Sequence, residues 1–156
     1  MCVLSDTVII GIGNPLCGDD GVGIALLEAL EGRVDADLVD AGTSAMQVVH
    51  ALAGRHRAIL LDCARMGLPF GTLRRFTPEE VANGTSLPRL SLHEGDLLAF
   101  LALARNLGAA PEEIILFGIE PASLEPAMHL SSILVAQMGD YLTAIIAEAK
   151  APFHSI

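Results

Sequence analysis

The sequence predicts an α/β protein, a three-layer α/β/α sandwich with a mostly parallel, twisted central sheet of about five strands. Short apolar runs rich in β-branched residues alternate with longer segments of helical apolar spacing, which is typical of a parallel sheet covered on both faces. The chain has 156 residues, a length typical of one domain. No repeat, linker or low-complexity block divides it, so we expect one domain over residues 1–156.

The first third of the chain supplies two strands and two helices. Residues 7–12 (TVIIGI) are almost continuously apolar, as in a buried central strand. Apolar spacing then predicts a helix over Val22–Leu30, with a glycine soon after its end. The segment ADLVDAGT predicts a second short strand that ends near Asp40. A hydroxyl side chain at position 43 or 44 can cap the next helix, which we expect to reach about Ala53.

The middle of the chain predicts a buried strand, an edge strand and an irregular segment. Residues 57–63 (RAILLDC) are apolar until Asp62, so this carboxylate is expected at the carboxyl end of the strand. Residues 71–76 (GTLRRF) are typical of an edge strand, and the following TPEE resembles a capping box that supports a short helical turn. Residues 83–92 lack periodicity and are predicted to form a mobile loop, a candidate lid that ends at His93.

The last third predicts a helix, a strand and a helix. Residues 95–107 have amphipathic helical spacing and are followed by a glycine. Residues 113–119 are predicted to form a further strand. A final helix is expected from Ser131 or Ser132 to about Lys150. This order completes the alternation on which the fold prediction depends.

Composition excludes several classes of protein. Nine basic and nineteen acidic residues give a net charge of −10, which opposes binding to nucleic acid or to an anionic membrane. The longest apolar run, residues 97–104, is far shorter than the roughly 18 residues of a membrane-spanning helix, and the N-terminus lacks a basic signal region. Cys2, Cys17 and Cys63 form no CxxC pair, and we expect each to be a buried apolar side chain. These features favour a cytoplasmic protein.

The stretch GIGNPLCGDDGVG, residues 11–23, resembles a phosphate-binding loop but carries acids where the phosphate would lie. Leu16 occupies the third glycine position of a dinucleotide-binding motif, and no Gly-Lys-Ser/Thr sequence indicates a P-loop. Asp19 and Asp20 would also repel a phosphate. Two interpretations of these acids remain open: capping of the following helix, or binding of a cation or protonated group.

Asp62 and His93 favour the cation interpretation. Parallel strands deliver the acids of residues 19–20 and Asp62 to one crevice, and His93 can approach it from a third direction. Two carboxylates and one imidazole leave coordination positions open for water or substrate, as a catalytic metal requires. The other histidines lack comparable acidic neighbours and are expected to be structural. HEGD lacks the second histidine of HExxH, no GxSxG is present, and the nearby acids disfavour a thiolate nucleophile.

The motifs GIGNPLCGDDGVG, DAGT, ILLDC, SLH and GIEP occur in an order that resembles the hydrogenase maturation endopeptidases. The resemblance runs from about Val8 to Leu142. It implies an α/β/α sandwich enzyme that removes a C-terminal extension from the large-subunit precursor of a nickel-iron hydrogenase after nickel insertion. The resemblance also suggests a basic residue before the scissile bond. The implied partner is that precursor, and we expect a monomer.

The resemblance also implies roles for individual residues. By match to the family motifs, Asp20, Asp62 and His93 fall at metal-ligand positions, and Asp40 in DAGT falls at a further acidic position. Asp40 is either a turn residue or an acid near the cleavage centre, and the resemblance favours the acid. Glu120 stands where many members have glutamine, so no role is carried over to it. The implied metal is nickel carried by the substrate, with zinc or cadmium as possible substitutes in a crystal.

Two other functions share these residues. A nickel-binding or chaperone-like module can use the same ligands without cleaving a peptide. An unrelated α/β hydrolase or nucleotide-binding protein can share the architecture.

Overall fold

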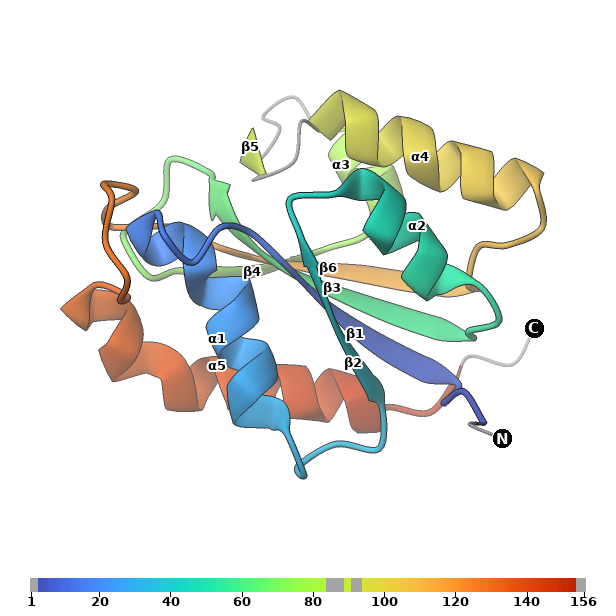
Figure 1. Cartoon of the computed structure of the whole chain (residues 1–156), viewed down its shortest axis with the longest axis horizontal. Coiled ribbons are helices and arrows are strands. Elements are labelled where there is room, and N and C mark those ends of the chain that lie inside the picture. Colours follow the sequence, from blue (N-terminus) through green and yellow to red (C-terminus); the bar gives the residue numbers. More distant parts are fainter. Residues whose placement is uncertain (1–2, 84–88, 91–93, 154–156) are drawn as a thin grey trace.

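The computed structural model describes residues 3–83, 89–90 and 94–153, and it confirms the predicted α/β/α sandwich (Figure 1). Each strand and helix expected from the apolar pattern is present, with small shifts at the ends. In chain order the elements are β1 (Thr7–Ile12), the 3-10 helix η1 (Gly18–Gly21), α1 (Val22–Leu30), β2 (Asp37–Gly42), α2 (Ala45–Leu52), β3 (Arg57–Arg65), β4 (Leu73–Phe76), α3 (Pro78–Asn83), β5 (Arg89–Leu90), α4 (Glu94–Asn106), β6 (Glu113–Ile119) and α5 (Ser132–Lys150).

The central sheet has the strand order β2-β1-β3-β6-β4. The first four of these strands are parallel, and β4 pairs antiparallel with β6 at the edge, as the sequence predicted for residues 71–76. Helices α1 and α5 cover one face, and α2, α3 and α4 cover the other (Figure 1). Alternate residues of the strands therefore enter two separate apolar cores, one on each face.

Strand β3 is the centre of the sheet and is longer than predicted. The sequence indicated an end at Cys63, but the strand continues to Arg65 because Ala64 and Arg65 pair antiparallel with β5. This pairing also corrects the expectation that residues 83–92 form an irregular loop, since Arg89–Leu90 is a strand. Two residues are too few to show a period in the sequence. The remainder of that candidate lid, apart from Asn83 at the end of α3, lies outside the described residues.

The helix starts follow the capping signals in the sequence. Ser44 accepts a hydrogen bond from the Gln47 amide at the start of α2, and Ser131 accepts one from the Leu134 amide at the start of α5. Thr77 forms the predicted reciprocal capping box with the side chain of Glu80, with distances of 3.2 and 3.3 Å. Among the residues that the structure describes, no helix has both the length and the apolarity to cross a membrane.

A buried arginine ties the C-terminal segment to the amino end of the sheet. Arg57 begins β3, is 1% exposed, and pairs with the Glu113 carboxylate at 2.8 Å. Its guanidinium also donates to four main-chain carbonyl oxygens after and at the end of α5, and it stacks on the Phe153 ring at 4.5 Å. The four acceptors are the carbonyl oxygens of Glu148, Ala149, Ala151 and Pro152. The charge is therefore satisfied although it is withdrawn from water.

Replacing Arg57 by leucine is expected to lower the free energy of unfolding by about 3–5 kcal/mol, because it leaves the Glu113 carboxylate without its buried cation and removes donors from several carbonyl groups. The matched control is Arg75→Leu. Arg75 pairs with Glu148 at 3.0 Å on the surface, where such a pair contributes at most about 1 kcal/mol. Urea unfolding of the two variants measures the difference. Equal losses would contradict the role assigned to Arg57.

Candidate active site

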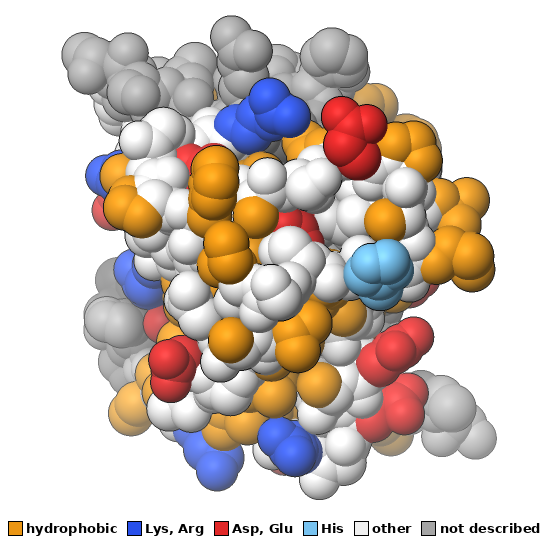
Figure 2. Space-filling view, turned by 90° about the vertical axis from the view of Figure 1, so that its left-hand side faces the viewer, with side chains coloured by type: hydrophobic (Ala, Val, Ile, Leu, Met, Phe, Trp, Pro, Cys, Tyr) orange, Lys and Arg blue, Asp and Glu red, His pale blue; other side chains and the backbone are white. Residues whose placement is uncertain are grey.

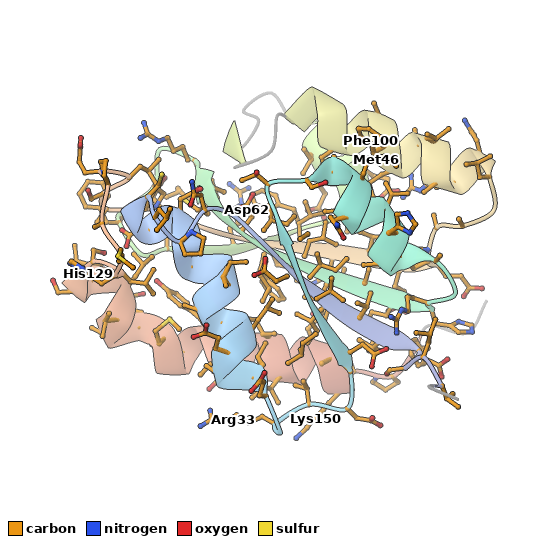
Figure 3. All side chains as sticks on the ribbon, viewed as in Figure 1. Arg33, Met46, Asp62, Phe100, His129 and Lys150 are labelled. Carbon is orange, nitrogen blue, oxygen red and sulfur yellow. The ribbon has the colours of Figure 1, made fainter. Side chains whose placement is uncertain are left out.

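The carboxyl edge of β1 and β3 is the point where the connections of the sheet diverge. From β1 the chain crosses to β2 on one side, whereas β3 lies on the other side of β1. In open parallel sheets ligands bind outside the strands at such a switch point. Asp62 lies here, on the last part of β3 (Figure 3). The topology thus predicts a ligand site at the same edge of the sheet that the acidic motifs indicated.

Helix α1 begins in direct contact with this edge. A Cβ atom added to Gly23 would lie 2.4 Å from the Leu61 carbonyl oxygen and 2.7 Å from that of Ile12. These distances are too short for any side chain, so glycine permits the helix to start against the ends of both strands. The preceding helix η1, which contains Asp19 and Asp20, is held at the same edge.

Asp20 and Asp62 both lie around the buried thiol of Cys63. Asp62 is 3% exposed, and Asp20 is half-buried and accepts a hydrogen bond from the Asn14 amide at 2.9 Å. Burial raises the pKa of the Cys63 thiol far above its usual range, and the charges of Asp62, Asp20 and Asp19 raise it further. The structure therefore brings these acids within electrostatic reach of one thiol, although they are far apart in the sequence.

The third expected ligand, His93, lies outside the described residues, which resume at Glu94 with α4. Within the described part of the chain, no three His, Cys, Asp or Glu side chains form a group that could hold a metal ion. Asp20 and Asp62 supply carboxylate oxygens, which are suitable donors for a divalent ion when an imidazole completes the set. The metal-ligand role of Asp20, Asp62 and His93 stays a prediction.

Asp40 lies at the same edge but in a different environment. It pairs in register with Gly11 on β1, which in turn pairs with Leu61, so Asp40 is nearly level with Asp62. Alternation along the strands places Asp40 and Asp62 on opposite faces of the sheet. Asp40 is exposed, and its carboxylate accepts the Gly42 amide at 2.8 Å, as in an Asx turn. A catalytic role for Asp40 stays a prediction.

Asp19 has a structural role that the sequence did not reveal. Neither η1 nor α1 has a side-chain cap, so Asp19 does not cap the following helix. Its carboxylate is instead 0% exposed and accepts hydrogen bonds from the main-chain amides of Ala122, Ser123 and Ser131. These partners are more than 100 residues away and are main-chain groups, so no pattern in the sequence could have identified them.

A cavity of about 690 Å³ lies beside the site, between the segments 65–70 and 120–125. One wall is held by the buried Glu120 carboxylate, which accepts the amides of Met66 and Leu68 at 2.9 and 2.7 Å through one of its oxygens. Glu120 therefore links the two walls of the cavity, because its carboxylate belongs to the segment 120–125 and its partners to the segment 65–70.

Exposed apolar side chains surround this side of the molecule. Leu16, Phe70 and Met128 are 59%, 60% and 84% exposed. They belong to segments on the left-hand side of Figure 1, and the space-filling view of that side shows apolar groups spread between polar ones (Figure 2).

Cys63 is expected to resist alkylation by iodoacetamide at pH 8 while the half-buried Cys17 reacts. Only the thiolate is nucleophilic, and the raised pKa of Cys63 keeps it protonated at this pH. Peptide mass spectrometry of the folded protein measures both sites, with urea-unfolded protein as the control in which both react. Equal labelling of the two sites in the folded protein would contradict the environment described for Cys63.

The comparisons with known proteins agree on one family. A family model described as hydrogenase maturation protease matches residues 24–148. The hydrogenase 2 maturation protease of Escherichia coli K12 is 30% identical over 149 residues, which cover 92% of this chain and 90% of that protein. The hydrogenase expression/formation protein HoxM of Cupriavidus necator is 34% identical over 122 residues, which cover 76% of this chain. The chain spans only about three fifths of the length of HoxM and of similar HupD and HupM proteins.

A solved structure shows the same architecture. The hydrogenase maturating endopeptidase HybD from Escherichia coli aligns with a TM-score of 0.77 at 27% identity, covering 91% of this chain and 90% of that one.

Proposed function

The chain belongs to the hydrogenase maturation protease family, and on this basis we propose that it is an endopeptidase that removes the C-terminal extension of a nickel-iron hydrogenase large-subunit precursor. The observation that carries the proposal is the pair of acids, Asp20 and Asp62, held at the switch point of a sheet of the family's fold. Cleavage follows nickel insertion, and the nickel in the precursor is the recognition signal.

In the proposed mechanism, the nickel arrives as part of the substrate. The carboxylates of Asp20 and Asp62, with the imidazole of His93, bind it and thereby fix the adjacent peptide bond at the edge of the sheet. Holding the scissile bond in one position supplies a large part of the rate enhancement. Hydrolysis requires that water attacks the carbonyl carbon of this bond: Asp40, at the end of β2, or one of the ligand acids accepts a proton from the water and delivers it to the leaving nitrogen as the C–N bond breaks.

The structure supports an approach of the precursor from the face shown in Figure 2. That face combines exposed Leu16 and Met128 with the loop that carries Asp20. A folded protein partner can bury these apolar groups while it places its C-terminal segment at the edge. We propose that the enzyme acts on the precursor as a monomer in the cytoplasm.

Incubation of the purified protein with nickel-loaded precursor is expected to shorten the large subunit by its C-terminal peptide, as measured by intact-protein mass spectrometry. The same precursor without nickel is expected to keep its mass, because the ligands then have no ion to bind. If the precursor binds the protein but keeps its full mass in both conditions, the chain is a binding module and not an endopeptidase.

The variants Asp20→Asn, Asp62→Asn and His93→Ala are each expected to reduce processing to below about 1% of wild type, since loss of a direct ligand costs more than the 10–100-fold typical of losing a group that supports one. Asp20→Asn retains an oxygen that can accept the Asn14 amide, so its loop stays in place. Asp35→Asn, at an exposed position near the opposite end of the sheet, is the charge-matched control. Wild-type processing by all three site variants would remove these residues from the site.

A further inference from the structure

We propose that Asp19 is a positioning residue for the reaction: its buried carboxylate fixes η1, and with it Asp20, against the segment 121–131. This inference rests on the proposed function. Asp20 and Asp62 come from separate segments of the chain, so their separation depends on whatever holds η1 in place. Asp19 is adjacent to Asp20 and is the most completely buried acid at this edge, with 0% exposure.

The contacts of the Asp19 carboxylate use both of its oxygens. Oδ2 accepts the amides of Ala122 and Ser123 at 2.8 and 3.1 Å, and Oδ1 accepts the amide of Ser131 at 2.7 Å. These bonds span sequence separations of 103, 104 and 112 residues. One side chain thus joins the loop after β1 to both ends of the segment that leads from β6 into α5.

Main-chain hydrogen bonds join the same two segments, the loop after β1 and the segment between β6 and α5. The amide of Gly18 donates to the Ala127 carbonyl oxygen at 3.0 Å, and the Ala127 amide donates to the Leu16 carbonyl oxygen at 3.0 Å. Gly18 has a positive φ of 59°, and a Cβ there would lie 2.9 Å from the Ser123 carbonyl oxygen. The two segments are therefore in direct main-chain contact, and the carboxylate lies at the centre of this contact.

The hydrogen bonds at position 19 require a side-chain carboxylate rather than a side-chain amide. Three amide donors converge on two oxygens, so an asparagine would direct its own NH₂ group at a main-chain N–H. A buried donor without an acceptor costs about 1–3 kcal/mol, and the structure can avoid this cost only by moving the loop. Glu120 differs in this respect, because it serves its two amides through one oxygen, which glutamine retains.

The movement would reach Asp20 directly. The Asp20 amide donates to the Cys17 carbonyl oxygen, and Asp20 Oδ2 accepts the Asn14 amide, so these two bonds attach the acid to the loop that contains η1. A displacement of η1 would therefore carry Asp20 away from Asp62. Misplacement of a reacting group by about 1 Å can cost on the order of 100-fold in rate.

The test compares Asp19→Asn with Glu120→Gln, each of which removes one negative charge from a buried carboxylate at this edge. Processing of nickel-loaded precursor is measured as kcat and KM per folded molecule, with the folded fraction taken from urea titration. Asp19→Asn is expected to lower kcat at least 10-fold with KM within about threefold of wild type. Glu120→Gln is expected to keep both constants within twofold. Wild-type kcat for folded Asp19→Asn would overturn the proposal.

A second pair leaves every charge in place and covers the case in which Asp19→Asn does not fold. Ser131 has φ −60° and ψ 154°, a conformation that proline adopts, so Ser131→Pro removes the amide that donates to Asp19. Ser131→Ala removes the same hydroxyl cap of α5 but keeps the amide. We expect a 3–10-fold lower kcat for the proline variant and a change below twofold for the alanine variant. Equal kcat values for the two would overturn the proposal.

Hydrogen exchange separates this inference from the proposed function. Protection of the Gly18 amide, which donates to the Ala127 carbonyl oxygen of the segment 121–131, is expected to fall at least 10-fold in Asp19→Asn or Ser131→Pro and to stay unchanged in Glu120→Gln and Ser131→Ala. This readout does not depend on substrate. If wild type fails to process the precursor, the proposed function fails while exchange still tests the positioning. Unchanged protection in both Asp19→Asn and Ser131→Pro would overturn the positioning role.

Discussion

The contact between the first turn of α1 and the ends of β1 and β3 is the constraint on which the site depends. Gly23 lets the helix start against the carbonyl oxygens of Ile12 and Leu61, at distances that exclude a side chain. The loop between β1 and α1 must therefore pass directly over the switch point of the sheet. An acid on this loop and an acid on β3 then meet in one place, although the loop and β3 are separated by α1, β2 and α2 along the chain.

Two buried charges hold opposite ends of the molecule by the same kind of interaction. At the carboxyl edge, the Asp19 carboxylate accepts main-chain amides, whereas at the amino edge the Arg57 guanidinium donates to main-chain carbonyl oxygens and to Glu113. Neither charge is exposed to water, so each depends on the complete set of its partners. Both bind the segments that flank α5, and this helix is consequently fixed at its beginning and at its end.

The sequence predicted the fold well because most elements have a clear local signal. The continuous apolar run of β3 and the capping box at Thr77 and Glu80 identified their elements without knowledge of the contacts. Strand β5 was missed because two residues carry no periodicity, and the extension of β3 was missed with it. At the site, Asp62 was placed by the end of an apolar strand, but Asp19 was indistinguishable from a helix cap since its partners are main-chain groups distant in the chain. His93 lies outside the described residues.

The hydrogen bonds between Asp19 and the segment 121–131 involve only main-chain groups of that segment, so they place little constraint on its side chains. Asp19 recognises only N–H groups there, and every amino acid except proline provides one at positions 122, 123 and 131. The path of this loop can thus be inherited while its surface diverges. Related proteins can therefore acquire new partners by changing the exposed side chains of this segment, with no change at Asp20 or Asp62.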